Sequence, residues 1–156
     1  MRQEQALRQL WAAIFVVLAA ILAPLPSAQV GDLRVVAEGV RSALGNVIFA
    51  LHHEGDPYPD KDSPFVGGFR RATVGTVGLT FGDLPAGRYA LVAVHDENLN
   101  RELDINRLGV PTEGVGFSNN SVGLFEPPGF ADASFEIKTD GEVTQSIRLI
   151  YLPGSS

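Results

Sequence analysis

The stretch that decides the fold is residues 88–95, which read RYALVAVH. It follows a tight connection at residues 83–87 (DLPAG), where proline presets φ and glycine can take a positive φ. Tyr89, Leu91 and Val94 cannot all face water, so the stretch predicts a buried β-strand. Farther along, apolar and polar residues alternate through residues 143–151 with a period of two. Both stretches favour an all-β protein.

The rest of the chain adds short strands separated by turns. We expect strands at residues 33–38, 46–52 and 133–137 and a hairpin from 69–74 and 77–81, with no convincing helix. The pattern predicts a seven-stranded antiparallel β-sandwich of immunoglobulin-like or transthyretin-like layout with one long ordered loop. That loop, residues 96–132, exceeds the ~12–15 residues usual for loops in compact domains, which indicates a functional segment.

The first 28 residues differ from the rest. Arg2 and Arg8 precede an apolar run at residues 10–23, and small residues follow two prolines. This order is typical of a secretory signal peptide, so we expect residues 1–28 to be removed and residues 29–156 to form one domain, periplasmic or secreted. An uncleaved membrane anchor and a buried core helix are the alternatives.

Composition excludes several classes of protein. The chain has 156 residues, no cysteine and a formal charge of -6, and residues 29–156 carry 10 basic and 17 acidic side chains. Without cysteine there are no disulfides, thiolate metal sites or cysteine nucleophiles. The acidic balance argues against nucleic acid as a partner, and we expect no membrane contact once the signal peptide is removed.

A cation site is the first candidate in the long loop. Oxygen-bearing side chains recur with the spacing of an EF-hand-type loop, and the carbonyl of Glu102 adds a ligand; the set is Asp96, Asn98, Asn100, Glu102 and Asp104. Arg101 stands where such loops have glycine, and Arg107 where they have glutamate. The alternatives are calcium and a metal-free network in which the Asp and Asn side chains cap their own backbone. No other cofactor is indicated.

Four segments carry a resemblance to a known family: residues 84–90 (LPAGRYA), 95–104 (HDENLNRELD), 109–120 (GVPTEGVGFSNN) and 127–130 (PPGF). In this order they resemble the secreted bacterial family called domain of unknown function 2141, over about residues 31–151. The resemblance implies a secreted transthyretin-like sandwich with no established activity. In the family's usual turn glycines stand at the positions of Leu99 and Arg101.

The main hypothesis is a non-catalytic module whose loop, residues 96–120, binds an ion, a small ligand or a protein of the cell envelope. The expected binding residues are His95, Asp96, Asn98, Asn100, Asp104, Glu113, Ser118, Asn119 and Asn120. One alternative is an extracellular hydrolase that uses His95 and Asp96, although adjacent strand residues point to opposite faces. Others are a three-histidine metal site (His52, His53, His95) and an envelope-tethered structural domain.

Overall fold

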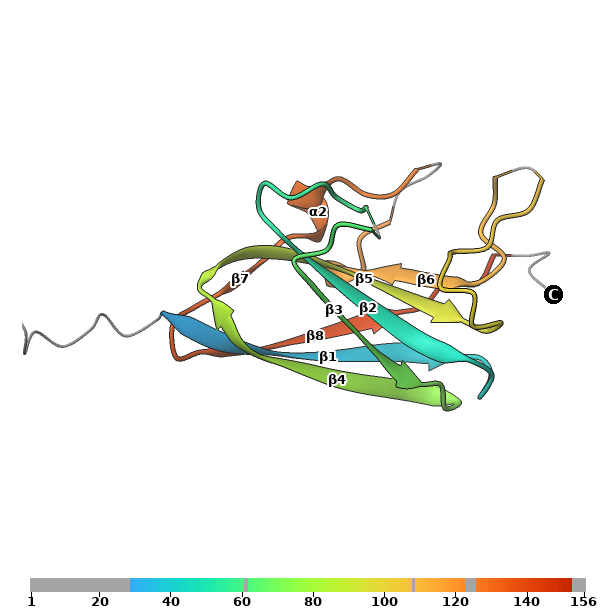
Figure 1. The fold of residues 1–156 in the computed structure, drawn as a ribbon, viewed down its shortest axis with the longest axis horizontal. Coiled ribbons are helices and arrows are strands. Elements are labelled where there is room, and N and C mark those ends of the chain that lie inside the picture. The colour runs from blue at the N-terminus through green and yellow to red at the C-terminus, as the bar shows by residue number, and fades with distance from the viewer. Residues whose placement is uncertain (1–28, 61, 108, 123–125, 153–156) are drawn as a thin grey trace, which may run out of the picture.

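The structure is a computed structural model that describes residues 29–60, 62–107, 109–122 and 126–152. These residues form two β-sheets that pack face to face (Figure 1), so the predicted β-sandwich is confirmed. The described residues contain eight strands instead of seven. The signal peptide predicted at residues 1–28 lies outside the described residues.

The smaller sheet contains three strands in the order β4-β1-β8. Their bounds are β1 Val30–Val40, β4 Gly75–Pro85 and β8 Glu142–Arg148. β4 is antiparallel to β1, whereas β8 is parallel to it. The prediction of a wholly antiparallel sandwich is therefore wrong for this pair. Because β8 is reached from a strand of the other sheet, no hairpin forces it to run against β1.

The larger sheet has the order β3-β2-β5-β6, and β7 also pairs with β5. Its strands are β2 Asn46–His53, β3 Val66–Arg71, β5 Gly87–Asp96, β6 Gly114–Phe117 and β7 Phe135–Ile137. All its pairs are antiparallel. The hairpin expected from residues 69–74 and 77–81 is wrong, because β3 and β4 belong to different sheets and the chain crosses between them.

The segment from 96 to 132 is less irregular than its sequence predicts. It contains β6, the 3-10 helix η1 (Ser118–Asn120) and most of the one-turn helix α2 (Phe130–Ala133). The strand expected at 133–137 begins only at Phe135, after α2. No helix among the described residues is long and apolar enough to cross a membrane.

Alternation builds the core between the sheets. One parity of each strand points inward, and its residues are buried: Leu33, Val35 and Ala37 in β1, Val47, Phe49 and Leu51 in β2, Val77, Leu79 and Phe81 in β4, and Tyr89, Leu91 and Ala93 in β5. The opposite parity of β2 and β5 points to the outer face of the larger sheet, where the candidate site lies.

Candidate functional site

The predicted binding loop leaves the end of β5, at the right of Figure 1. Asp96, the last residue of β5, is 1 % exposed. Its Oδ1 accepts a hydrogen bond from the backbone N–H of Asn100 (3.2 Å), and its Oδ2 accepts one from the N–H of Arg101 (3.0 Å). The loop's own backbone thus satisfies this buried carboxylate, which in turn fixes the conformation of the loop.

The two asparagines continue this network. Asn98 Oδ1 accepts from the N–H of Asn100 (2.9 Å), and Asn100 Oδ1 accepts from the N–H of Glu102 (2.8 Å). Both side-chain amides donate to the Asp104 carboxylate, at 2.5 Å from Asn98 and 2.9 Å from Asn100. These are the local side-chain-to-backbone bonds that Asx turns make.

Glu113 ties the two ends of the loop together. It is 4 % exposed, its Oε1 accepts from the N–H of Glu97 (2.9 Å) and its Oε2 from the N–H of Asp104 (3.3 Å). Burial raises the pKa of Glu113, and the nearby carboxylates of Asp104 and Asp96 raise it further, against the effect of the two N–H donors. The loop therefore closes around three neighbouring carboxylates.

The calcium prediction stays a prediction. In the loop, oxygens of Asp96, Asn98 and Asn100 face backbone N–H groups, and Asp104 faces two side-chain amides. Across the described ranges, no group of three or more His, Cys, Asp or Glu side chains is placed to hold a metal ion. This arrangement is that of the metal-free network, and calcium would have to displace some of its hydrogen bonds.

Two residues of the loop adopt a left-handed backbone without being glycine. Leu99 has φ +66° and Arg101 has φ +64°. For an L-residue with a side chain this conformation costs about 1–2 kcal/mol. These are the two positions at which the resemblance described above implies glycine, so the loop keeps a glycine-type path with larger side chains.

His95 and Asp96 do not converge. His95 is fully buried on the inner face of the sheet, where Nδ1 lies 2.8 Å from the Tyr151 hydroxyl and Nε2 lies 2.9 Å from the Leu44 carbonyl. Asp96 lies on the opposite, outer face, engaged by the loop amides. The convergence that a His95/Asp96 hydrolase requires is absent from this pair.

The other predicted binding residues lie apart from the loop. The Ser118 hydroxyl accepts from Leu91 N–H (2.9 Å) and donates to the Ala133 carbonyl (2.5 Å). Asn119 donates to the carbonyls of residues 132 and 134, and Asn120 accepts from Arg148 N–H. Leu91 is five residues before Asp96, about 16 Å along the strand. Ser118, Asn119 and Asn120 therefore join the two sheets and do not share a site with Asp96.

A contact that the sequence did not indicate anchors the loop to the sandwich. The Glu97 carboxylate accepts from the Arg41 guanidinium (2.5 Å) and the Ser42 hydroxyl (2.7 Å), and Arg41 also lies 4.5 Å from the centre of the Tyr151 ring. The hydrogen bond from Arg41 is the main cause that lowers the pKa of Glu97. No spacing along the chain relates Arg41 to Glu97, so only the fold reveals the pair.

The outer face of the larger sheet forms the floor of a groove. Strand register places the floor side chains in cross-strand rows: Phe69, Ile48 and Val94 in one, and Gly67, Ala50 and Val92 in the next. Most are half-buried or nearly buried, whereas Phe69 remains 58 % exposed. The floor is apolar, although it faces away from the core.

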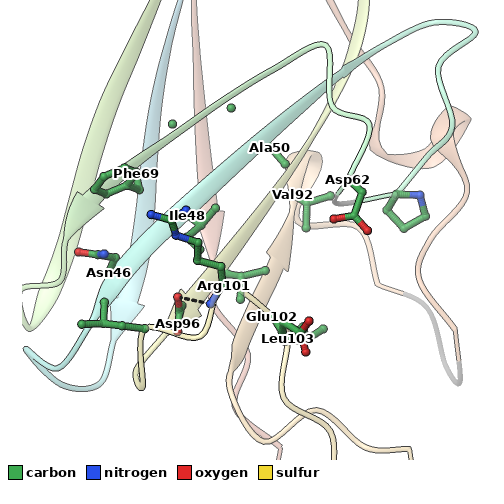
Figure 2. A pocket seen from close by; sticks show the side chains of 15 residues that line it. Asn46, Ile48, Ala50, Asp62, Phe69, Val92, Asp96, Arg101, Glu102 and Leu103 are labelled. Atoms are coloured by element: carbon green, nitrogen blue, oxygen red, sulfur yellow. Dashed lines mark hydrogen bonds between the residues drawn. The ribbon is translucent and has the colours of Figure 1, made fainter.

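Two loops wall this groove, which has a volume of about 670 Å³. One wall is formed by Leu99 and residues 101–103 of the Asp96 loop. Asp62, from the loop between β2 and β3, stands at the far end (Figure 2), and Pro59 of the same loop also lines the groove. Ligand pockets commonly have volumes of ~300–1,000 Å³ and apolar linings with a few polar groups. The groove, rather than the loop alone, is the candidate site.

Arg101 is the cation of the groove. Figure 2 shows its side chain extending from the loop across the floor beside Ile48. Among the described residues its guanidinium has no ion-pair partner. The hydrogen bond from Arg101 to Asp96 is made by the backbone N–H. The cross-strand row next to that of Ile48 holds Asn46, and Arg71 lies opposite Asn46 in β3. This end of the groove is therefore rich in hydrogen-bond donors.

Beyond the far end, a buried histidine packs beneath the loop between β2 and β3. His52 is fully buried, neither ring nitrogen has a hydrogen-bond partner of normal geometry, and the ring contacts Tyr58 edge-on at 5.3 Å. Burial lowers the pKa of His52, an effect that the Pro57 carbonyl and the carboxylates of Asp56 and Asp60 only partly oppose. Burial also raises the pKa of Tyr58 to about 12.

One signal in the sequence could have revealed the groove. Residues 47–51 (VIFAL) are apolar at both parities, although only one parity is needed for the core. A strand that is apolar on both faces indicates that both faces are covered or that one binds an apolar partner.

Comparison with protein families gives one match. Residues 35–146 match the model of DUF2141, described as an uncharacterized protein conserved in bacteria. We find no match among curated proteins and none among solved structures.

Proposed function

The chain belongs to the DUF2141 family, and we propose that it is a non-catalytic binding module of the bacterial cell envelope whose ligand lies in the groove on the outer face of the larger sheet. The apolar floor carries the proposal. Ile48, Ala50, Val92 and Val94 face away from the core and line a groove of about 670 Å³. A ligand that covers these apolar side chains removes them from water, and this burial favours binding.

The hydrogen-bonded loop supports this proposal. Asp96 and Glu113 hold the loop through four backbone N–H groups, so the wall exists before a ligand arrives. A preformed wall reduces the conformational entropy that binding would otherwise cost. The loop then serves as a wall of the binding site, with Arg101 and Leu103 facing the ligand.

A neutral apolar dye tests the groove. We expect the fluorescence of Nile red to rise with the wild-type protein and to stay low with Ala50→Glu, which places a charge in the apolar floor. Thr80→Glu is the matched control, because Thr80 is exposed on β4 of the other sheet. Absence of dye binding by wild type, or equal binding by both variants, would show that the groove is not an apolar binding site.

The absence of catalysis is part of the proposal. Of the histidines, His95 is engaged on the inner face and His52 is buried outside the groove lining. The lining carboxylate of Asp96 is occupied by two amides. A survey of ester, glycoside and peptide substrates should give no hydrolysis that responds to His95→Gln.

Location in the periplasm or outside the cell is also proposed. It is supported by the basic start and the apolar run at residues 10–23. Mass spectrometry of the protein purified from the producing cell should find an N-terminus near Gln29. An intact N-terminus on a membrane fraction would instead favour an envelope-tethered structural domain.

Calcium binding by the loop is a second candidate, favoured by one observation. The Glu113 carboxylate accepts from the Asp104 backbone N–H (3.3 Å), and its pKa is raised by burial and further by the carboxylates of Asp104 and Asp96. A cation would relieve this repulsion. Millimolar calcium should then raise the melting temperature, and a chelator should reverse the rise, because a ligand of the native state stabilises it. No shift would exclude this candidate and leave the groove unaffected.

A further inference from the structure

We infer that the ligand of the groove is a small amphiphile, an alkyl chain with one anionic head group, whose head is bound by Arg101. This inference rests on the proposed function, since it names the chemical class that the groove accepts. It depends on how charge and apolar surface are distributed along the floor.

One end of the groove is cationic. Arg101 lies in the groove with no ion-pair partner among the residues that the structure describes, and Asn46 beside it offers an amide. Arg71 lies opposite Asn46 on β3, and alternation points it to the same outer face. Guanidinium groups bind carboxylate and phosphate through paired N–H donors, so this end suits an anionic head group.

The carboxylates that line the groove do not block an anionic head group beside Arg101. Asp96 shares the row of Asn46, but it is 1 % exposed and both its oxygens face backbone N–H groups. Glu102 lies beside Leu103, away from the Arg101 guanidinium (Figure 2), and Asp62 stands at the far end. The groove is therefore polarised, with the Arg101 guanidinium toward Asn46 and the Asp62 carboxylate at the other end.

The middle of the groove suits an alkyl chain. Between Asn46 and Ala50 the floor extends about 13 Å at ~3.3 Å per residue. Along this length Ile48, Ala50, Val92 and Val94 present aliphatic side chains, and Phe69 adds an aromatic ring. A ligand whose head group lies beside Arg101, near Ile48, lays its acyl chain on the floor toward Ala50 and Val92. A polar ligand would leave these side chains unmatched.

Displacement of Nile red tests the inference on the full domain. We expect decanoate and decyl phosphate to displace the dye at about tenfold lower concentration than decanol, since each adds a charged hydrogen bond at a partly open site. If decanoate alone shows the gain, the head group is a carboxylate. If decyl phosphate alone shows it, the head group is a phosphate. Each result supports an anionic amphiphile.

Substitution of Arg101 completes the test. Arg101→Gln should abolish the tenfold preference while Nile red still binds, and Arg101→Lys should retain part of it. Arg34→Gln, which removes an exposed cation from β1 of the other sheet, should leave the preference unchanged.

Two results would overturn the inference. Equal displacement by decanol and both anions, or a preference that survives in Arg101→Gln, rejects the role of Arg101 while the groove itself still binds the dye. Failure of wild type to bind Nile red rejects the groove as well. The two failures are therefore distinguishable.

Discussion

Replacement of Asp96 by alanine tests whether one carboxylate organises the binding loop. The substitution removes the acceptor of two backbone N–H groups, those of Asn100 and Arg101. Hydrogen bonds to charged groups contribute ~1.5–3 kcal/mol each, and part of this returns when the freed N–H groups bind water. We expect the free energy of unfolding to fall by about 2–4 kcal/mol, and by about half as much in Asp96→Asn, which keeps one acceptor oxygen.

The measurement combines two readouts. Urea denaturation followed by circular dichroism gives the free energy of unfolding, with an unchanged slope if only stability changes. Amide hydrogen exchange at residues 100 and 101 should accelerate even where the loop opens before the sandwich unfolds.

Asp104→Ala is the matched control for Asp96→Ala. Among the described residues, the Asp104 carboxylate accepts from the side-chain amides of Asn98 and Asn100, which lie at the surface. Its loss should cost about 1 kcal/mol or less, as usual for surface substitutions. If Asp96→Ala costs no more than Asp104→Ala, and exchange at residues 100 and 101 is unchanged, the carboxylate does not organise the loop.

Four further substitutions test three other features of the structure. His52 has a lowered pKa because it is buried, so the unfolded chain binds a proton that the native state excludes, and stability should fall as pH drops below ~6.5, by up to about 1.4 kcal/mol per pH unit. His52→Phe should remove this part of the acid sensitivity in urea titrations at pH 5 and pH 7.5, and an unchanged difference would contradict the assignment. Gly116→Ala should destabilise by about 1–3 kcal/mol, because a Cβ at Gly116 would lie 2.5 Å from the Arg148 carbonyl oxygen; a wild-type melting temperature would contradict this. Arg101→Gly should stabilise by about 0.5–1 kcal/mol, since relief of the left-handed strain exceeds the entropy cost of glycine, whereas Glu102→Gly, at an ordinary φ, should destabilise by a similar amount.

The sequence predicted the sandwich because alternation is a local property. In β1, β2 and β5 the inward parity could be read directly from residues such as Leu33, Phe49 and Leu91. β6 was missed because Gly114 and Gly116 make its sequence resemble a turn. Its glycines are required by close approach: a Cβ at Gly114 would lie 2.4 Å from the Tyr151 ring. That requirement depends on a residue distant along the chain, which spacing cannot show.

The candidate site was predicted only in part. Asp96, Asn98, Asn100 and Asp104 were expected to act together, and they do form one network. Ser118 to Asn120 had the same composition, yet they join the sheets instead, because composition does not show whether a polar side chain meets backbone or solvent. The groove was missed because its residues come from three strands whose order in the sheet the sequence does not reveal.

The parallel pairing of β1 with β8 has a consequence for folding. Asp32 pairs with Glu142 across about 110 residues, so the central strand of the smaller sheet gains its second neighbour only from the last strand of the domain. During synthesis the N-terminal part of the chain appears first. One edge of β1 therefore stays unpaired until nearly all of the domain has been made. Non-local pairings of this kind fold slowly, and open strand edges recruit other chains. The module is therefore expected to be most vulnerable to aggregation during its synthesis and transport, before β8 closes that edge.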